Sequence, residues 1–369
     1  MREAVERRRP RAWITRSAVH GFKVGEPEFQ LTPEDRNMQV PRSVGIDVAA
    51  KTYVAAWECP DGRRRQQTFA NSQHGHQQLI AAIDPSAGCC RVVIEATGVY
   101  SLGLALSLHA TDDIEVMLVN PRAAKDFARA NMTRAKTDGI DADSLMAFVQ
   151  RMPFVPWTPP PDAVLKLRGL TRRLHQLKLE LHREGNRAKQ AEMVEDQAVV
   201  HDIDLNMRHL QRRVDKLQDA CLDLIQADDQ LNAQYQRITS VPGIASRTAP
   251  VLLAELGVLA ADMKGKQWVA HAGLDPRPFE SGTSINKPRR ISKVGNRYLR
   301  HALYMPALVA IRNDQHIAAY YAALVQRGKK PKQAIIAVMR KLLLALHGME
   351  RSQTPFDPGR FYRLPADAA

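Results

Sequence analysis

The chain has 369 residues, which exceeds one ordinary domain of about 100–200 residues and indicates two or three domains. Hydrophobic residues make up 44% and charged residues 25%, so the chain can bury substantial cores, and its four cysteines have the spacing of neither a zinc site nor a disulfide framework. No run approaches the roughly 18 consecutive apolar residues of a membrane span, and the arginine-rich start lacks the apolar core of a secretory signal. We therefore expect a soluble, cytoplasmic protein with no membrane partner.

The net charge of +14 is concentrated in the last third of the chain. Residues 236–369 contain 21 basic and 8 acidic side chains, whereas residues 43–159 contain 11 and 12. A clustered positive field attracts polyanions, and nucleic acid is the default polyanion for a cytoplasmic protein. The charge pattern predicts nucleic-acid binding by the C-terminal part; the alternative is a basic face that serves solubility alone.

The N-terminal half is predicted to consist of an arm and a mixed α/β domain. Residues 1–42 show no sustained periodicity and predict a flexible basic arm; because Met38 stands just before the first strand, residues 1–37 are either native or an artefact of start-codon choice. Beyond them the residue patterns predict strands at 43–49, 52–58, 66–70, 91–96 and 114–119 and helices at 73–83, 100–109, 122–130 and 140–150. A three-stranded meander followed by alternating strands and helices predicts that residues 43–155 form a ribonuclease H-like (RuvC-like) domain.

The middle of the chain is predicted to be helical. Five prolines between positions 153 and 161 break the chain and mark a linker. Residues 160–235 then show two heptad seams: Leu167, Leu170, Leu174, Leu177 and Leu181, followed by Leu210, Val214, Leu217, Cys221 and Leu224. Two such helices form either a helical hairpin within one subunit or a coiled coil that joins subunits, and the heptad spacing favours neither over the other.

The C-terminal region is predicted to be mainly helical. Residues 236–347 form the expected third domain, interrupted by a glycine-rich segment at 273–295 and ending in a strong helix at 332–347. The Pro- and Arg-rich residues 348–369 are expected to be an irregular tail.

Two carboxylates interrupt apolar strands of the first domain. Asp47 lies in the middle of the first strand and Glu95 near the end of the fourth. A carboxylate in a buried strand is costly unless it is paired or binds a cation. Asp138 and Asp141 are three residues apart and so share a face in the first turn of a later helix. The four can converge on Mg²⁺, and two such ions about 4 Å apart can clamp the attacking and leaving oxygens of a phosphodiester.

Each carboxylate alone has a simpler explanation. Asp138 and Asp141 can cap a helix, where the N-terminal dipole favours negative charge. Asp143 points elsewhere on the same helix and is expected to be solvated. Taken together with Asp47 and Glu95 on the expected elements, the set favours a metal site.

Four sequence blocks carry a family resemblance. They are Gly45-Ile46-Asp47, Glu95-Ala96-Thr97-Gly98, Asn120-Pro121, and Lys136-Thr137-Asp138 followed by Asp141-Ala142. Together they resemble the DEDD transposases of the insertion sequence 110 family, the recombinases guided by a bridge RNA, over roughly residues 43–346. The resemblance implies that the catalytic metal ligands are Asp47, Glu95, Asp138 and Asp141. It also implies donor and target DNA and a bridge RNA as partners, with the two domains paired across subunits.

A serine block in the basic third is similar to the C-terminal transposase signature of that family. The resemblance implies that Ser281, in the pair Ser281-Gly282, is the nucleophile, with Ser284 and Ser292 as alternatives. A serine hydroxyl attacks phosphate when its proton is removed and the phosphate charge is neutralised. Six basic residues are expected to contact nucleic acid: Arg277, Arg289, Arg290, Lys293, Arg297 and Arg300. Glu280 departs from the uncharged residue expected before the serine, and without the resemblance Ser281 would be read as a loop residue beside a turn glycine.

The segment Val241-Pro242-Gly243-Ile244-Ala245 resembles a helix-hairpin-helix, whose backbone N–H groups bind phosphate. Ala245 stands where the stronger form of the motif has glycine, so plain helix packing is an equal alternative.

These features predict a DNA transposase or site-specific recombinase in which Ser281 attacks a DNA phosphate at a site with two Mg²⁺ ions. One alternative is a metal-dependent nuclease resembling the Holliday-junction resolvases, in which water attacks and Ser281 is structural. The other is a non-catalytic nucleic-acid-binding protein derived from a transposase, against which the presence of all four carboxylates argues.

Overall fold

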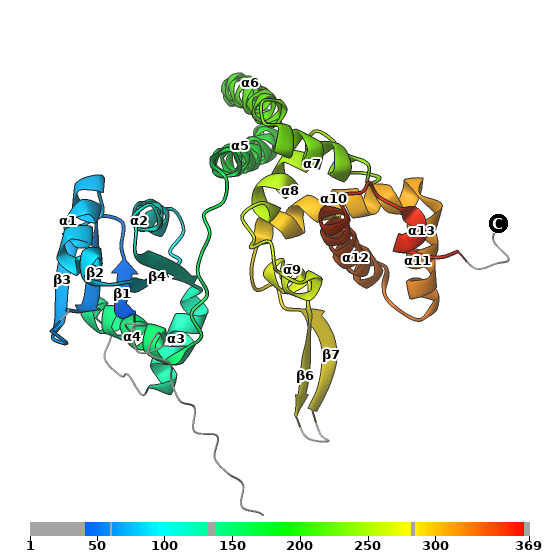
Figure 1. Ribbon diagram of the computed structural model, residues 1–369. Coiled ribbons are helices and arrows are strands. Elements are labelled where there is room, and N and C mark those ends of the chain that lie inside the picture. Colours follow the sequence, from blue (N-terminus) through cyan, green and yellow to red (C-terminus); the bar gives the residue numbers. More distant parts are fainter. Residues whose placement is uncertain (1–40, 60, 132–136, 282–284, 365–369) are drawn as a thin grey trace, which may run out of the picture. The chain divides into compact units, whose positions relative to one another are not determined.

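The chain forms two compact units, Met1–Phe154 (unit 1) and Val155–Ala369 (unit 2). The boundary between them along the sequence falls within the proline-rich linker. The computed structural model describes residues 41–59, 61–131, 137–281 and 285–364, with the backbone alone at 278–281 and 285–289 (Figure 1). The predicted arm, residues 1–42, lies outside the described residues except at its end. Arg42 there belongs to the first strand rather than the arm, and its guanidinium donates to the carbonyls of Ile83 (2.8 Å) and Gly88 (3.1 Å).

Unit 1 is a five-stranded sheet with helices on both sides (Figure 1). Its strands are β1 (Arg42–Val48), β2 (Thr52–Glu58), β3 (Arg64–Ala70), β4 (Cys90–Glu95) and β5 (Ile114–Val119). Its helices are α1 (Gln73–Ile83), the short η2 (Pro85–Ala87), α2 (Val99–His109), α3 (Pro121–Ala130) and α4 (Asp138–Arg151). The order β3-β2-β1-β4-β5, antiparallel over the first three strands and parallel from β1 to β5, is compatible with a ribonuclease H-like domain.

The centre of the sheet is apolar on both faces. Ile46 of β1 and the run Val92–Ile94 of β4 are fully buried, because helices cover the two sides of these strands. Continuous apolar runs of this kind are typical of strands in a sheet covered on both faces. The carboxyl ends of β1 and β4 therefore lie at one edge of a rigid core.

Unit 2 is mainly helical. Its elements are α5 (Asp162–Met193), α6 (Gln197–Gln226), α7 (Asp229–Thr239), α8 (Ala249–Leu256), α9 (Gly265–His271), β6 (Pro276–Ser281), β7 (Ile285–Ile291), α10 (Arg297–Asn313), α11 (Gln315–Gln326), α12 (Pro331–Ser352) and α13 (Pro358–Phe361). In the described ranges no helix combines the length and the apolarity that a membrane crossing requires.

The two heptad seams face each other within one chain. Leu174 and Leu177 of α5 pack against Leu210 and Val214 of α6, so the helices form a hairpin. The base of this hairpin joins the core of the C-terminal helices, since Leu167 and Cys221 are buried in the same cluster as residues of α8, α10 and α12. Residues 160–235 and 236–347, expected as two domains, thus share one unit.

Two expectations about irregular segments are wrong. The interruption at 273–295 contains the antiparallel hairpin of β6 and β7. The tail expected from residue 348 onward is largely ordered, since α12 continues to Ser352 and α13 follows. Phe361 of α13 is buried against Tyr320, with ring centroids 5.8 Å apart, so contact with the rest of unit 2 orders the tail.

Candidate functional site

Asp47 and Glu95 lie at the carboxyl ends of two neighbouring strands. Strands β1 and β4 are parallel, and Ile46 pairs with Ile94, so the residue that follows each of them is a carboxylate at the same level of the sheet. Both side chains are partly buried. Parallel strands bring residues from distant parts of the chain to one edge, which is how this fold joins the first two acids.

Helix α4 approaches β1 closely because Gly45 has no side chain. An ideal Cβ on Gly45 would lie 2.2 Å from the carbonyl oxygen of Ala142 and 2.2 Å from the backbone nitrogen of Met146. This contact holds the first turn of α4, with Asp138 and Asp141, next to the strand that carries Asp47. The glycine of the first family block thus has a packing role in placing the site.

Asp138 and Asp141 lie in the first turn of α4, but neither is its N-cap. The N-cap is Thr137, whose side chain accepts a hydrogen bond from the backbone N–H of Ile140 (3.3 Å). Both aspartates nevertheless lie where the helix dipole favours negative charge, as the simpler explanation requires. Asp143 forms an ion pair with Arg64 of β3 (2.5 Å).

The other three carboxylates act electrostatically on Asp47. Burial and the charges of three neighbouring acids raise the pKa of Asp47 from 3.8 to about 6. In decreasing order of effect these acids are Glu95, Asp141 and Asp138, while a hydrogen bond with the backbone of Val48 acts in the opposite direction. A concentration of negative charge beside a half-buried acid is an environment that favours a bound cation.

The donor set fits a divalent metal in its chemistry. Hard cations prefer carboxylate and hydroxyl oxygens. Thr97 lies two residues after Glu95, and its buried Oγ1 has no hydrogen-bond partner among the described residues. Within the same described residues no group of three or more His, Cys, Asp or Glu side chains has the spacing of a preformed metal site. A cation would have to draw the four acids closer together, so their role as ligands stays a prediction.

Asn71 links the segments that follow β1 and β4, and sequence reasoning missed it. Its Nδ2 donates to the carbonyls of Ala49 and Tyr100, at 3.0 Å each. Nε2 of His76 is hydrogen-bonded to its Oδ1 (3.2 Å). Asn71 thereby fixes the chain just after Asp47 relative to the start of α2. An asparagine between a strand and a helix resembles an ordinary turn residue, so the sequence carries no signal for this role.

In unit 2, Ser281 is the last residue of β6 and pairs with Ile285 of β7. The hairpin projects from the helices around it (Figure 1). Ser281 therefore ends a strand rather than lying in a loop. The side chains of Ser281 and Arg289, and all of Ser284, lie outside the described residues.

Arginines face each other on the β6–β7 hairpin. Arg277 and Arg290 are direct cross-strand partners, and both are exposed. Like charges in this position destabilise a ladder, which an anion bound between them would relieve. Lys293 and Arg297, beyond the hairpin, are also exposed. These four residues are therefore accessible to a polyanion.

The root of the hairpin is held by hydrogen bonds. The Ser292 hydroxyl donates to Oδ1 of Asp275 (2.5 Å), and the backbone N–H of Ser292 donates to the Asp275 carbonyl (2.9 Å). Nη1 of Arg300 donates to the carbonyl of Ala272 (2.8 Å). Ser292 and Arg300, both expected from sequence to act on nucleic acid, thus have contacts that shape the hairpin root.

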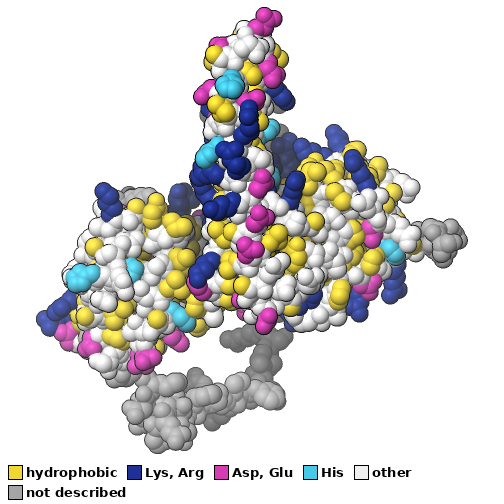
Figure 2. Space-filling view, turned by 90° about the horizontal axis from the view of Figure 1, so that it is seen from above, with side chains coloured by type: hydrophobic (Ala, Val, Ile, Leu, Met, Phe, Trp, Pro, Cys, Tyr) yellow, Lys and Arg dark blue, Asp and Glu magenta, His cyan; other side chains and the backbone are white. Residues whose placement is uncertain are grey.

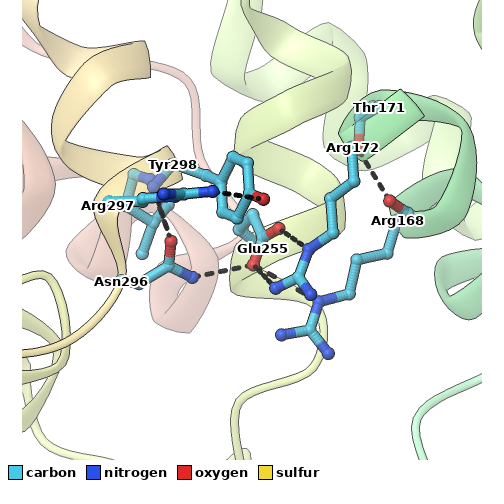
Figure 3. Close-up of polar contacts among 8 residues, drawn as sticks. Arg168, Thr171, Arg172, Glu255, Asn296, Arg297 and Tyr298 are labelled. Carbon is cyan, nitrogen blue, oxygen red and sulfur yellow. Dashed lines mark hydrogen bonds and ion pairs between the residues drawn. The ribbon is translucent and has the colours of Figure 1, made fainter. Parts of the chain in front are cut away.

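A buried carboxylate of α8 joins three elements of unit 2 (Figure 3). Glu255 is 0% exposed and accepts hydrogen bonds from Nε of Arg172 (2.8 Å), Nε of Arg168 (3.3 Å) and Nδ2 of Asn296 (2.7 Å). Asn296 is also the N-cap of α10, where its side chain accepts from the N–H of Tyr298 (2.9 Å). Glu255 therefore ties α5 to the start of α10, directly beyond the hairpin root.

Glu255 stays ionised despite its burial. Burial acts to raise its pKa, but the hydrogen bonds from Arg172 and Asn296 and the charges of Arg168 and Arg172 outweigh it, so the pKa is lowered. Sequence reasoning missed this residue, although a carboxylate in the apolar helix α8 is the same signal that drew attention to Asp47.

Replacing Gly45 by alanine tests the packing of α4. The added methyl meets backbone atoms, which cannot rotate away, so we expect a loss of about 1–3 kcal/mol in unfolding free energy and impaired activity as Asp138 and Asp141 are displaced. Gly103→Ala in α2 is the matched control: its Cβ would meet only His76, at 3.7 Å, and the change is expected to stabilise by about 0.5–1 kcal/mol. Thermal unfolding of both variants measures the difference; equal stability would contradict the close approach.

Comparison with known proteins identifies the family. The transposase family model of the DEDD type named for IS110 matches residues 44–191, and the model described as the IS116/IS110/IS902 transposase family matches residues 235–322. The pilin gene-inverting protein of Moraxella bovis is 32% identical over 321 residues, covering 85% of this chain and 97% of the relative. An IS110 protein of Streptomyces coelicolor, described as uncharacterized, is 33% identical over 129 residues, covering 35% of this chain and 31% of the relative. The chain therefore belongs to the IS110 family of transposases and is a DNA-recombining enzyme.

Proposed function

We propose that this transposase cuts and rejoins DNA with Ser281 as nucleophile and with Asp47, Glu95, Asp138 and Asp141 as ligands of catalytic Mg²⁺. The observation that carries the proposal is the electrostatic coupling of the three other acids to Asp47 at one edge of the unit 1 sheet. Such perturbed, clustered acids mark functional sites more often than structural ones. The family relationship supports the assignment of the chemistry to DNA.

The metal site would be formed by unit 1 alone. Asp47 and Glu95 come from adjacent strand ends, and Asp138 and Asp141 from the turn of α4 that Gly45 admits. Two bound Mg²⁺ ions would supply charge stabilisation for the phosphate oxygens during displacement. Within this site Asn71 would act as a positioning residue, because it holds the segments after both strands in place.

The covalent step is balanced without an external energy source. The Oγ of Ser281 forms a bond to the DNA phosphorus and loses its proton, while the bond from that phosphorus to one deoxyribose oxygen breaks and the leaving oxygen gains a proton. A deoxyribose hydroxyl of the exchanged strand then attacks the phosphoserine and releases Ser281. Each cut phosphodiester is restored, so the energy of the broken bond is retained in the protein–DNA link.

The partners follow from charge and from the family. Exposed Arg277, Arg290 and Lys293 would contact phosphates, and a two-stranded ribbon such as β6–β7 has dimensions that a DNA major groove can admit. We propose that a bridge RNA base-pairs with donor and target DNA, so that sequence specificity lies in the RNA while the protein contacts shape and backbone. We further propose a homo-oligomer, a dimer or a tetramer, assembled through the α5–α6 region.

The direct test of this function is a search for the covalent intermediate. Purified protein, Mg²⁺, candidate guide RNA and end-labelled DNA are incubated and separated under denaturing conditions. A labelled species that survives denaturation and disappears with protease supports the phosphoserine link. Cleavage with no such species would support instead the metal-dependent nuclease in which water is the nucleophile.

The charge distribution makes a separate prediction about the two units. Residues 155–369 contain 33 basic and 21 acidic side chains, against 11 and 12 in residues 43–154. We expect DNA affinity of the unit 2 fragment to fall with a slope of about −0.9 in log–log salt plots for each phosphate contact, and the unit 1 fragment to bind weakly. Fluorescence anisotropy with a labelled duplex measures both. Equal binding by the unit 1 fragment would show that the basic excess is not the main contact.

A further inference from the structure

A second set of basic side chains lies on unit 2, in elements outside the β6–β7 ribbon. Six basic side chains from α5, α10 and the α7–α8 loop form it: Arg172, His175, Lys178, Arg247, Arg297 and His301. We call this set the α5–α10 basic surface. Of the six, only Arg297 was expected from sequence to contact nucleic acid.

Four of the six side chains are linked by contacts around the ring of Tyr298. The guanidinium carbons of Arg172 and Arg297 lie 4.9 and 5.2 Å from the centroid of the Tyr298 ring. The His175 ring lies 5.1 Å from that of Tyr298 and 5.2 Å from that of His301. Long cationic side chains that pack on rings are held in place, so less conformational entropy is lost when they bind an anion.

The positive charge of this surface is not balanced locally. Of the described residues, none forms an ion pair with Lys178, Arg247 or Arg297, although Arg297 donates a long hydrogen bond (3.4 Å) to the Tyr298 hydroxyl. The single negative charge of Glu255 is shared by the guanidiniums of Arg168 and Arg172, so one of these two positive charges is not neutralised by it.

The titration behaviour agrees with an excess of positive charge. Burial, followed by the charges of His301, Arg297 and Lys178, lowers the pKa of His175. Burial and then Arg247 lower the pKa of Lys178, against the weaker opposing effects of Cys221 and Asp215. An anion bound at this surface would offset both the burial and the repulsion that lower these two pKa values.

We propose that the α5–α10 basic surface binds the phosphate backbone of duplex DNA, as a contact separate from the β6–β7 ribbon. Charge complementarity assigns the ligand class, because a chain of cations spread over three elements matches an extended polyanion. Figure 2 shows that Lys and Arg side chains also lie along the protruding α5–α6 hairpin. The choice of DNA, rather than another polyanion, rests on the proposed recombination of DNA.

The α7–α8 loop supports the same ligand. Arg247 lies in it, close to the helix-hairpin-helix-like segment, and is exposed, as is Ala245. Gly243 has φ +87° and packs against α10, since a Cβ there would lie 2.7 Å from the carbonyl oxygen of Pro306. The glycine is thus explained by packing of the loop on α10. The charge of Arg247 in the same loop acts on Lys178 of α5.

The test is DNA binding by the full chain in the absence of divalent cations, so that cleavage does not enter. A triple variant, Lys178→Ala with Arg247→Ala and Arg297→Ala, is compared with wild type by anisotropy of a fluorescein-labelled random-sequence duplex. The slope of log affinity against log salt concentration is expected to decrease in magnitude by up to about 2.7. The ratio of the affinities at about 50 and 200 mM salt then shrinks by about 40-fold. A charge-conserving triple variant, Lys178→Arg with Arg247→Lys and Arg297→Lys, is expected to retain most of the wild-type slope.

A matched control removes three exposed cations elsewhere on unit 2: Arg312→Ala, Lys329→Ala and Lys332→Ala. It has the same net charge as the test variant, so an equal loss in both would show that only the overall charge matters and would overturn the proposal. Loss of binding to a labelled RNA hairpin with unchanged duplex binding would overturn it in favour of RNA. Because binding is measured apart from catalysis, a wild type that never cuts DNA would refute the proposed function and leave this inference standing.

Discussion

The variant Asp47→Asn is expected to lose DNA cleavage entirely and, in metal-free buffer, to unfold at a higher temperature than wild type. The first effect follows from the loss of a central metal ligand. The second follows from the carboxyl's raised pKa of about 6, since forcing a charge on Asp47 above that pH costs folding free energy. The rise of the Asp47 pKa from 3.8 to about 6 corresponds to at most about 3 kcal/mol of unfolding free energy.

The pH dependence distinguishes this cause from a general packing effect. A folded-state pKa above the unfolded value means that the wild-type carboxyl contributes its full stability below pH 3.8 and loses it as pH rises through about 6. The advantage of the asparagine variant should therefore be absent below pH 3.8, grow as pH rises from 3.8 to about 6, and stay constant above that. Thermal unfolding with EDTA across this range measures it, and added Mg²⁺ should stabilise wild type far more than the variant.

Asp143→Asn is the matched control for Asp47→Asn. Asp143 lies on α4 but forms an exposed ion pair with Arg64, so its loss is expected to cost no more than about 1 kcal/mol and to leave cleavage intact. An active Asp47→Asn enzyme, or an unfolding profile that parallels wild type at every pH, would remove Asp47 from the proposed metal site.

The sequence predicts unit 1 well because its signals are local. Every strand of the sheet except the polar β3 is a short apolar or β-branched run, and each carboxylate of the site stands out against such a run or at a helix start. The structure adds what no local pattern contains: Gly45 as the contact point for α4, and Asn71 as a link between two strand ends. Both roles depend on partners far away in the sequence.

The errors in unit 2 have a common physical origin. Strands β6 and β7 contain prolines at 276, 278 and 288, which normally argue against a strand, but a two-stranded hairpin has free outer edges where a missing N–H is tolerated. Helix α12 runs beyond the predicted boundary to Ser352. Helix α13 follows it and is held in place because Phe361 packs on Tyr320. Tertiary contacts therefore decide both segments, whereas composition alone favours irregular structure.

The variant Ser281→Ala is expected to abolish both cleavage and the covalent protein–DNA adduct while leaving DNA binding nearly intact. The change removes one oxygen at the end of β6, and its cost in stability should stay within about 0.5 kcal/mol. Asp47→Asn abolishes the same reaction by a different route, through the metal site, so the two variants should be inactive for separable reasons: Mg²⁺ should still stabilise Ser281→Ala against unfolding.

Two serine controls make the assignment specific. Ser292→Ala removes the hydroxyl that donates to Asp275 at the hairpin root, so cleavage should slow while the adduct still forms. Ser284→Ala should leave both unchanged. End-labelled DNA on denaturing gels decides between the possibilities, because a metal-dependent nuclease uses water and would cut without any adduct in all variants. A fully active Ser281→Ala protein would end the serine mechanism, and an adduct lost only in Ser292→Ala would move the nucleophile to the root of the hairpin.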